Sequence, residues 1–588
     1  MKGSDSNFFQ FMVGKDHYII PLYQRAYSWG HDQCATLYND MLALHDKLQS
    51  NTDLSYNFSH FLGSVVYQNS NDPRQPGIFL IDGQQRVITM YLFYLALYRA
   101  ALDCGGPDAA FAPKLELTHL SNAQGKHRFT LSTQEDQVAM DKLFAGNKDE
   151  YLTDSHITNN FNYFYQHLKS EQKMTLTDFY NITQRLSFVE IALDREDDAQ
   201  VIFESVNSKG LPLSHGEKVK NFILMGISQD QAQLSYSEHW APMERNCKEA
   251  QGESGLDNFI YHYIAIKRAN LPEFGKLYDE FKSFHLRCLQ EKQPLADKVL
   301  LAAEMHKYSE LFKSVKTCKY VLLPSDHDED GTLQAEIELG LKRLSYMPYE
   351  RHIPFLMQTM WLQRQHEISV AELIETINLL EMFYIRRWTC EVPTNTLNRF
   401  FASLHSQINS LSDEEAGSGF INKLKYVLRT DAARLPNDTR FRFCLENSDF
   451  YGEYDLIYYL FERLDSHGQR EIVPIMDKRA KNSKAFTVEH IMPQTLTDDW
   501  REELGPNAQE LYETWLNRLG NLTITAYNSK LSNKTFAEKR DMPNGYRDSA
   551  LHLNKDIAKH EHWREEDLKQ RAEELATKAL QIWPYPEA

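Results

Sequence analysis

Two short motifs near the end of the chain constrain its fold more than any other feature. The first is Val488-Glu489-His490-Ile491-Met492-Pro493, and the second is Gly520-Asn521-Leu522, which Asn528 follows. The first motif ends a β-branched strand, and its proline opens a loop. The segment 527–539 has the spacing of a helix that packs back on this strand. Strand, loop and helix in this order predict a compact ββα unit that holds a metal ion.

The residue types in these motifs suit phosphodiester hydrolysis. The reaction needs a base that activates water and a divalent cation that neutralises charge on the phosphate. His490 is the candidate base, because the ordinary pKa of histidine lies near neutrality. Carboxylate and amide oxygens are ligands that suit Mg²⁺ and Mn²⁺, and Glu489 and Asn528 supply one of each. We therefore predict a metal-dependent site with the layout of an HNH nuclease.

The same motifs resemble the HNH module at the C-terminus of GmrSD-type Type IV restriction enzymes. The matching residues are Glu489-His490-Ile491-Met492-Pro493-Gln494, Leu519-Gly520-Asn521-Leu522-Thr523, Asn528, Leu531-Ser532-Asn533, Phe536 and Lys539. The resemblance implies that His490 and Asn521 are catalytic residues. His490 would be the general base, and Asn521 would orient the loop. It further implies that Asn528 is a metal ligand and that Lys539 holds a phosphate. Glu489 is either a direct ligand or a residue behind the ligands. The alternative is a chance surface pair of Glu489 and His490.

The overall charge of the chain argues mildly against DNA binding. The formal net charge is −18, whereas DNA-binding proteins normally present clustered lysines and arginines to phosphates. Basic residues nevertheless flank the two motifs: Lys478, Arg479, Lys481, Lys484, Lys530, Lys534, Lys539 and Arg540. We predict that Lys484, Lys534 and Lys539 contact DNA, although such a run is also typical of an ordinary solvated surface.

A second candidate site lies in the N-terminal half. Asp82-Gly83-Gln84-Gln85-Arg86 follows the strand-like run 77–81 and begins a segment with apolar residues at helical spacing. A helix N-terminus offers unpaired N–H groups to a phosphate, and Arg86 adds a positive charge. The alternative is a polar turn with no ligand, because Asp-Gly turns are common. No P-loop sequence is present.

This region resembles the ParB-like nucleotide-hydrolysing domain of the same restriction enzymes. The resemblance is carried by Tyr23-Gln24-Arg25, Leu62-Gly63, the 82–86 motif, and a third element that contains Glu204, Asn207, Lys218 and Lys220-Asn221. It implies a nucleoside triphosphate site, for ATP or GTP, in which Asp82 and Arg86 take part in hydrolysis. The residues implied to line it are Gln24, Arg25, Asp82, Gly83, Gln84, Gln85, Arg86, Glu204 and Asn207.

A chain of 588 residues is too long for one hydrophobic core. We expect an α+β protein with a ParB-like mixed α/β domain over 1–230 and a largely helical connection over 231–410. A ββα-metal HNH nuclease domain set within helices is expected over 411–588, with the last helix packed against it. Arg386-Arg387-Trp388 could hold a phosphate and a base, but we expect these side chains to belong to the core.

The cysteines and the apolar segments indicate the cellular compartment of the protein. The seven cysteines are scattered without a C-x-x-C pair, which is typical of a reducing compartment and argues against a structural zinc knuckle. We find no signal peptide and no apolar run of about 18 residues that would span a bilayer. We therefore expect a cytoplasmic protein with no membrane contact, and a homodimer is possible because it would present one nuclease site to each strand.

Together the two resemblances imply a single-chain, modification-dependent restriction endonuclease that defends against phage. Its expected substrate is double-stranded DNA with hydroxymethylated, methylated or glucosylated cytosine, and nucleotide binding or hydrolysis would regulate cleavage by a Mg²⁺ or Mn²⁺ site. One alternative is an NTPase-nuclease that senses phosphorothioate DNA. Another is a nucleotide-regulated DNA-binding protein that does not cut.

Overall fold

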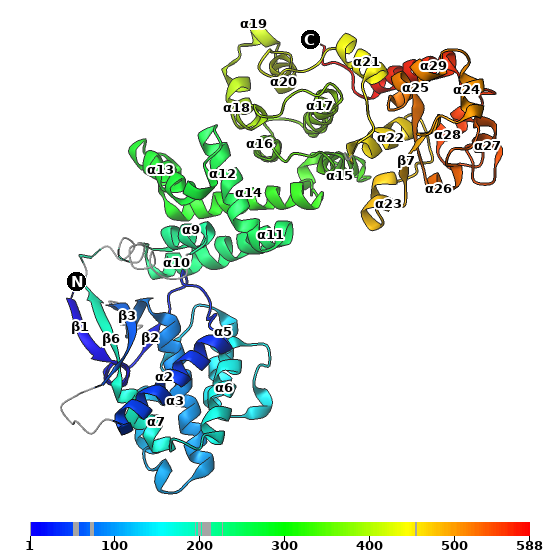
Figure 1. The fold of residues 1–588 in the computed structure, drawn as a ribbon. Helices are drawn as coiled ribbons and strands as arrows, with labels where there is room; N and C mark the ends of the chain where they lie inside the picture. The colour runs from blue at the N-terminus through cyan, green and yellow to red at the C-terminus, as the bar shows by residue number, and fades with distance from the viewer. Residues whose placement is uncertain are drawn as a thin grey trace. The chain divides into compact units, whose positions relative to one another are not determined.

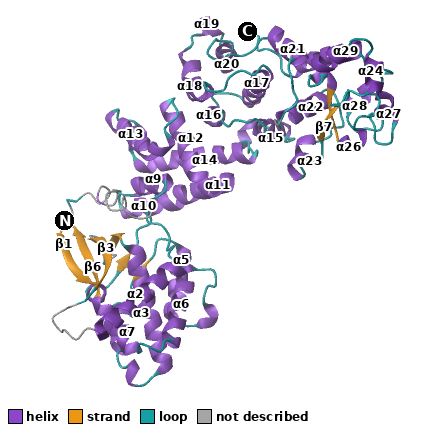
Figure 2. Cartoon of the chain, viewed as in Figure 1, coloured by secondary structure: helices purple, strands orange, loops and turns teal. Residues whose placement is uncertain are grey.

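The computed structural model describes residues 2–50, 58–70, 76–194, 196–197, 202, 213–225, 227–452 and 455–587. The protein is α+β, as the sequence predicts: most described residues are helical, and the strands belong to a six-stranded and a two-stranded sheet (Figure 2). The chain forms two compact units. Unit 1 comprises Met1–Pro242 and His285–Glu304, and unit 2 comprises Met243–Phe284 and Met305–Ala588. The division into three domains stays a prediction.

Unit 1 is built on the mixed six-stranded sheet, whose strand order is β1-β6-β3-β4-β2-β5. Its strands are β1 (Lys2–Asn7), β2 (Tyr18–Ile19), β3 (His60–Asn69), β4 (Ile78–Asp82), β5 (Phe129–Thr130) and β6 (Leu186–Leu193). Strand β3 runs parallel to β6 and antiparallel to β4, while β2 runs parallel to both β4 and β5. Helices gather on one side of this sheet (Figure 1). The helices of unit 1 that precede β6 are α1 (Phe8–Val13), α2 (His31–Ser50), α3 (Gln84–Cys104), α4 (Ala112–Leu115), α5 (Gln134–Ala145), α6 (His156–Ser170) and α7 (Leu176–Ile182).

Helix α3 forms the core of unit 1. It begins directly after β4 and packs against α6 and α7, with Phe93 meeting Phe164 edge to face at 5.3 Å between ring centroids. Among the described residues, α3 is the helix whose length and composition would allow it to cross a membrane, and the sequence search did not single it out. Most of its side chains are buried inside the unit. A helix that is apolar on every face is expected in such a position.

Helices make up most of the rest of the chain. Those before the second sheet are α9 (His215–Leu224), α10 (Gln229–Ser235), α11 (Ala241–Gln251), α12 (Gly255–Arg268), α13 (Leu277–Gln290), α14 (Lys298–Thr317), α15 (Thr332–Ser345), α16 (Ile353–Arg364), α17 (Val370–Thr389), α18 (Leu397–Ser410), α19 (Asp413–Ala416), α20 (Phe420–Leu428), α21 (Asp438–Asn447), α22 (Leu456–Ser466) and α23 (Ile475–Lys481).

The arginines near the end of α17 belong to the core. Arg386 is fully buried and donates to the carbonyl oxygens of Trp583, at 2.8 Å, and Pro436, at 3.0 Å. Arg387 donates to the carbonyl oxygen of Pro393 at 2.7 Å. The ring of Trp388 meets that of Phe450 edge to face. These side chains therefore connect elements within unit 2, as expected, instead of presenting a surface to DNA.

The second sheet pairs β7 (Thr487–His490) with β8 (Leu522–Thr525) in antiparallel register. The helices around it are α24 (Asp498–Leu504), α25 (Ala508–Trp515), α26 (Asn528–Leu531), α27 (Phe536–Asp541), α28 (His552–Ile557) and α29 (Glu565–Ile582). The single helix predicted over 527–539 is wrong, because α26 and α27 are separate. Ser532 takes a positive φ of 44° between them, and Thr535 starts α27 with a capping box to Glu538. Helix α29 packs on the turn before β8, as expected of the last helix.

Gly83 joins β4 to α3 in a conformation that other residues rarely adopt. Its φ is +85°, and a Cβ at this position would lie 2.8 Å from the carbonyl oxygen of Ser64. We predict that Gly83→Ala lowers the opening free energy of α3 by at least about 1–2 kcal/mol, measured by native-state hydrogen exchange. Gly3→Ala is the matched control, because Gly3 has nothing within 4 Å of its added Cβ. Equal exchange rates in the two variants would contradict this prediction.

Candidate functional site

Strand β7 presents successive side chains to opposite faces of the small sheet. Val488 and His490 therefore lie on one face, and Glu489 lies on the other. Glu489 is opposite Thr523 of β8, and His490 is opposite Leu522. The two residues of the predicted Glu-His pair consequently have different environments.

Glu489 forms a buried ion pair with Lys539 of α27. The Lys539 ammonium lies 2.6 Å from Glu489 Oε1 and also donates to the backbone carbonyl oxygen of His490 at 2.7 Å. Neither charged side chain is accessible to solvent beyond a few per cent. Burial raises the pKa of Glu489 and lowers that of Lys539, while the ion pair opposes both shifts. The structure thus shows neither metal ligation by Glu489 nor a surface position for Lys539, because each charge neutralises the other inside the core.

His490 lies in a polar and aromatic niche with only 6% of its surface exposed. Its Nε2 is 3.2 Å from Oδ1 of Asn517, and its ring meets the exposed ring of Tyr451 at 4.4 Å between centroids. Burial lowers the pKa of His490 below its ordinary value, the Asn517 hydrogen bond opposes this shift, and the charge of Lys539 adds to it. A lowered pKa keeps the imidazole neutral near pH 7, which is the form that accepts a proton.

Asn521 is fully buried and holds the loop that follows β7. Its Oδ1 accepts a hydrogen bond from the Met492 N–H at 2.8 Å, and its Nδ2 donates to the Met492 carbonyl oxygen at 3.0 Å. Nδ2 also donates to the carbonyl oxygen of Leu516, and the Asn521 carbonyl oxygen accepts from the Ile491 N–H. These are the contacts of a residue that orients the loop, and the side chain does not reach the surface.

Asn528 begins α26, which packs against β7. Its Nδ2 donates to the carbonyl oxygen of Val488 at 2.7 Å, so the orientation of the amide is fixed. The amide oxygen is then the atom that suits a hard cation. Among the described residues, no three His, Cys, Asp or Glu side chains are grouped so that they could hold a metal ion. Of the two predicted metal ligands, Asn528 has a suitable arrangement and Glu489 does not.

The predicted DNA contacts differ in their accessibility. Lys484 precedes β7 and Lys534 lies between α26 and α27, and both side chains are exposed. Lys539 is buried, as described above. Arg479, in the same basic run, donates to the carbonyl oxygens of Ser483 and Phe486, both at 2.6 Å. Lys484 and Lys534 are therefore the predicted contacts that a DNA phosphate can reach.

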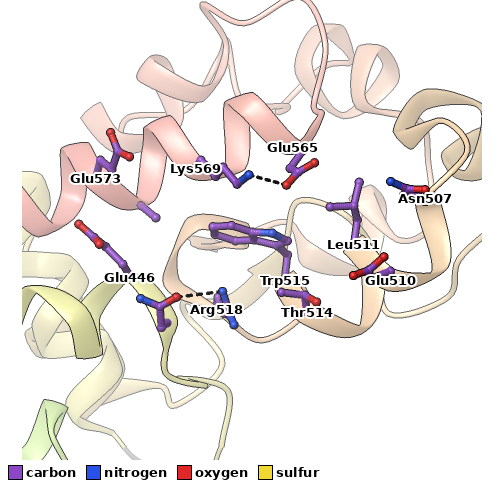
Figure 3. Close-up of a pocket in the computed structure, with 12 residues that line it drawn as sticks. Glu446, Asn507, Glu510, Leu511, Thr514, Trp515, Arg518, Glu565, Lys569 and Glu573 are labelled. Atoms are coloured by element: carbon purple, nitrogen blue, oxygen red, sulfur yellow. Dashed lines mark hydrogen bonds and ion pairs between the residues drawn. The ribbon is translucent and has the colours of Figure 1, made fainter.

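A cavity of about 400 Å³ lies between α21, α25 and α29, next to Trp515 (Figure 3). Four glutamates line it: Glu446, Glu510, Glu565 and Glu573. Its cations have partners, since Lys569 lies 2.5 Å from Glu565 and Arg518 donates to Asn447 at 3.2 Å. The excess of negative charge disfavours a phosphate here. The cavity contains none of the residues predicted for either site.

In unit 1, the predicted phosphate motif brings together two arginines and one aspartate. Arg86 donates to the Ser64 carbonyl oxygen at 2.7 Å, and Gly63 leaves space for it, since an added Cβ would lie 3.3 Å from Arg86 Cζ. Burial raises the pKa of Asp82, while Arg86, the Gly83 N–H and Arg25 oppose the shift. Helix α3 begins at this point without a side-chain cap. The arrangement provides positive charge and N–H groups next to a partly buried carboxylate.

The three glutamines of this region mainly brace the 24–29 loop. Gln24 donates to the Ile81 carbonyl oxygen at 2.8 Å. Gln85 Oε1 accepts from the N–H groups of Ser28 and Trp29, at 2.9 and 3.2 Å. Gln84 Nε2 donates to the Arg25 carbonyl oxygen, while no donor among the described residues reaches its buried Oε1. The predicted site residues Glu204 and Asn207 lie outside the described residues.

Two neighbours of His490 did not emerge from the sequence motifs. Asn517 precedes the second motif by three residues, and Tyr451 lies far upstream, after α21. The Phe450 N–H donates to the Asn517 carbonyl oxygen at 2.8 Å, which brings the two segments together. No periodicity or spacing indicates this contact, because it depends on how the chain before α22 meets the turn before β8.

Comparison with known families assigns both halves of the chain. The model of the GmrSD restriction endonuclease N-terminal domain matches residues 7–224, and that of the GmrSD restriction endonuclease C-terminal domain matches residues 435–578. The two matches define a restriction endonuclease, an enzyme that acts on DNA. Because together they cover more than half of the chain, the protein belongs to the GmrSD family of Type IV restriction enzymes, with both domains in one polypeptide. A search of curated proteins gave no significant match.

The buried ion pair makes a testable prediction about stability. Lys539→Met leaves the Glu489 carboxylate buried without its cationic partner, with the Tyr546 hydroxyl at 3.5 Å as the remaining donor, so we expect a loss of about 3–5 kcal/mol in the free energy of unfolding of unit 2, measured by urea titration. The double variant Glu489→Gln, Lys539→Met removes both charges. We expect it to be more stable than the Lys539→Met variant, and the reverse order would contradict the interpretation of the pair.

Proposed function

We propose that this enzyme cuts modified DNA at an HNH-type site in unit 2 and that a nucleoside triphosphate bound in unit 1 controls the cutting. The observation that best supports the nuclease site is the position of His490. Its imidazole is held against Asn517 and Tyr451, and burial lowers its pKa. A neutral, immobilised imidazole is suited to act as a general base.

In this proposal, His490 takes a proton from the water that attacks the scissile phosphate. Asn521 keeps the loop after β7 in place through its bonds to Met492, and so fixes the direction in which the strand presents His490. Lys484 and Lys534 neutralise phosphates on either side of the cut. The ion pair of Glu489 and Lys539 supports the strand from its other face.

Asn528 is the proposed protein ligand of a Mg²⁺ or Mn²⁺ ion, through its amide oxygen. The bound cation would offset negative charge on the phosphate and on the leaving oxygen. Mg²⁺ commonly keeps several waters and uses substrate phosphates as ligands, so a single amide oxygen from the protein is compatible with this kind of site.

The proposed nucleotide site lies where α3 begins. Phosphates would meet the free N–H groups of the first turn, with Arg86 and Arg25 supplying positive charge. Asp82 would act on the attacking water or on a cation that accompanies the nucleotide. The uncommitted Oε1 of Gln84 suits a donor of the ligand, such as a ribose hydroxyl.

The proposed substrates are double-stranded DNAs that carry hydroxymethylated, methylated or glucosylated cytosine, such as those of phages. Family membership supports this substrate class. Phosphorothioate DNA is the second candidate substrate, and a protein that binds DNA without cutting it is the second candidate function. Cleavage assays on plain, base-modified and phosphorothioate DNA, each with and without NTP, distinguish these possibilities.

His490→Ala tests the nuclease proposal. We expect cleavage of modified DNA in the presence of Mn²⁺ to fall by about 10²- to 10⁴-fold, because the base is lost. DNA binding, measured by fluorescence anisotropy, should stay within about twofold. His562→Ala is the control, because that histidine is half exposed and lies beyond the motif. Unchanged cleavage in His490→Ala would rule out His490 as the base, whereas a wild type that binds modified DNA without cleaving it would support the binding protein that does not cut.

Asp82→Asn tests the coupling between nucleotide and cleavage. The change keeps the size of the side chain and removes its charge, so we expect NTP hydrolysis, measured by phosphate release, to fall by at least about tenfold. The NTP-dependent part of cleavage should fall with it. Asp46→Asn, at an exposed position of α2, is the control. Cleavage that responds to NTP as in the wild type would rule out control by this site.

A further inference from the structure

Among the described residues, one polar side chain lies within hydrogen-bond distance of the His490 ring. This neighbour is Asn517, whose Oδ1 lies 3.2 Å from Nε2. We propose that Asn517 is a positioning residue that holds the hydrogen of the imidazole on Nε2 and leaves Nδ1 free to take the proton from water. The inference rests on the proposed nuclease function, since it concerns the same histidine.

Asn517 is itself fixed by the chain around it. Its carbonyl oxygen accepts the Phe450 N–H at 2.8 Å, and the next residue, Arg518, forms an isolated β-bridge with Asp449. Arg518 also donates to Asn447 at 3.2 Å, with its guanidinium 5.1 Å from the ring centre of Trp515. The amide that faces His490 is thus carried by a segment bound at both backbone and side chain. The Asn517 amide must be fixed in this way if it is to select one tautomer and one orientation of the imidazole.

The chemistry of the reaction decides which end of the amide must face the ring. If Oδ1 faces Nε2, it accepts the N–H of the neutral imidazole and still accepts it after Nδ1 has been protonated. If Nδ2 faced Nε2 instead, its N–H would confront the N–H of the imidazolium and oppose proton transfer. The arrangement with Oδ1 next to Nε2 is therefore the one compatible with a base, by the same logic that pairs a histidine base with an orienting acceptor.

Other contacts prevent the ring from turning away. Lys539 holds the backbone of His490 through its carbonyl oxygen at 2.7 Å, and Tyr451 packs against the ring at an interplanar angle of 64°. Lys539 thus constrains the backbone of His490, Asn517 constrains Nε2, and Tyr451 constrains one edge of the ring. Nδ1 is the ring nitrogen that remains for the attacking water. Since Tyr451 is exposed, this niche lies next to solvent, from which the attacking water comes.

The step that Asn517 supports is balanced in protons and bonds. A proton passes from water to Nδ1 of His490 as the water oxygen forms a bond to phosphorus. The bond from phosphorus to the leaving sugar oxygen breaks, and that oxygen takes a proton from solvent. His490 then returns its proton to solvent, with Nε2–H bonded to Asn517 throughout.

The test compares three full-length variants with the wild type in steady-state cleavage of modified DNA. Asn517→Leu removes the acceptor, and we expect kcat to fall by about 10- to 100-fold with KM within about twofold. Asn517→Asp keeps an oxygen at the same distance, and we expect it to restore kcat to within about threefold of the wild type. Asn507→Leu, at an exposed position that lines the acidic cavity, is the control and should cut normally.

A second measurement reads the tautomer without relying on cleavage. In protein labelled with ¹⁵N-histidine, magic-angle-spinning NMR distinguishes protonated from unprotonated ring nitrogens, and the signals absent from His490→Ala identify His490. We expect a protonated Nε2 in the wild type and in Asn517→Asp, and a mixture of tautomers in Asn517→Leu. An unfolded chain would also give mixed tautomers, so circular dichroism and a thermal melt of Asn517→Leu, compared with the wild type, check that the variant is folded.

The outcomes separate the two levels of the proposal. Normal kcat in Asn517→Leu, or a wild-type His490 protonated on Nδ1, would overturn the role of Asn517 and leave the nuclease function intact. If the wild type and His490→Ala behave alike in cleavage, the proposed function fails, and the catalytic role of Asn517 fails with it. Loss of kcat in Asn517→Leu, restored by Asn517→Asp and accompanied by mixed tautomers, supports both.

Discussion

The contact between Lys539 and Glu489 holds together the small sheet of unit 2 and the helix packed on it. Two opposite charges lie 2.6 Å apart where almost no water reaches, and either one alone would be costly to bury. Because Lys539 also donates to the His490 carbonyl oxygen, α27 and β7 are joined at the proposed base. Strand β7 has only four residues, and a two-stranded sheet of this length is weakly stable by itself. The ion pair therefore helps to fix the position of the strand.

Both candidate sites use side-chain amides to hold a loop. In unit 2, Asn521 bonds the backbone of Met492 through both ends of its amide. In unit 1, Gln85 bonds two N–H groups of the loop at Ser28 and Trp29, and donates to Ala26. A buried amide satisfies the donors and acceptors that an irregular loop leaves unpaired, which makes the loop rigid. Asn521 and Gln85, which are prominent in the two motifs, thus mainly hold the backbone of a neighbouring loop in place.

The sequence allowed the α+β class, β7 and the core position of Arg386 to be predicted, because strand composition and helical spacing are local properties. It did not allow Glu489 and Lys539 to be paired, because that contact joins residues 50 positions apart on separate elements. The break at Ser532 was missed, since its positive φ appears in no pattern of apolar residues. Asn517 was missed for a similar reason: its partner is set by tertiary packing, and asparagine before a turn is unremarkable by composition.

Helix α3 has a consequence for the synthesis of the chain. It is made before α6 and α7, which pack against it in the finished unit, so part of its apolar surface stays uncovered until roughly eighty further residues have left the ribosome. During that interval the nascent segment resembles a membrane span in length and composition. Rapid docking onto the early strands, or shielding by a chaperone, must then compete with aggregation and misdirected insertion. The helix that begins at the proposed nucleotide motif is thus also the segment on which the yield of folded protein depends.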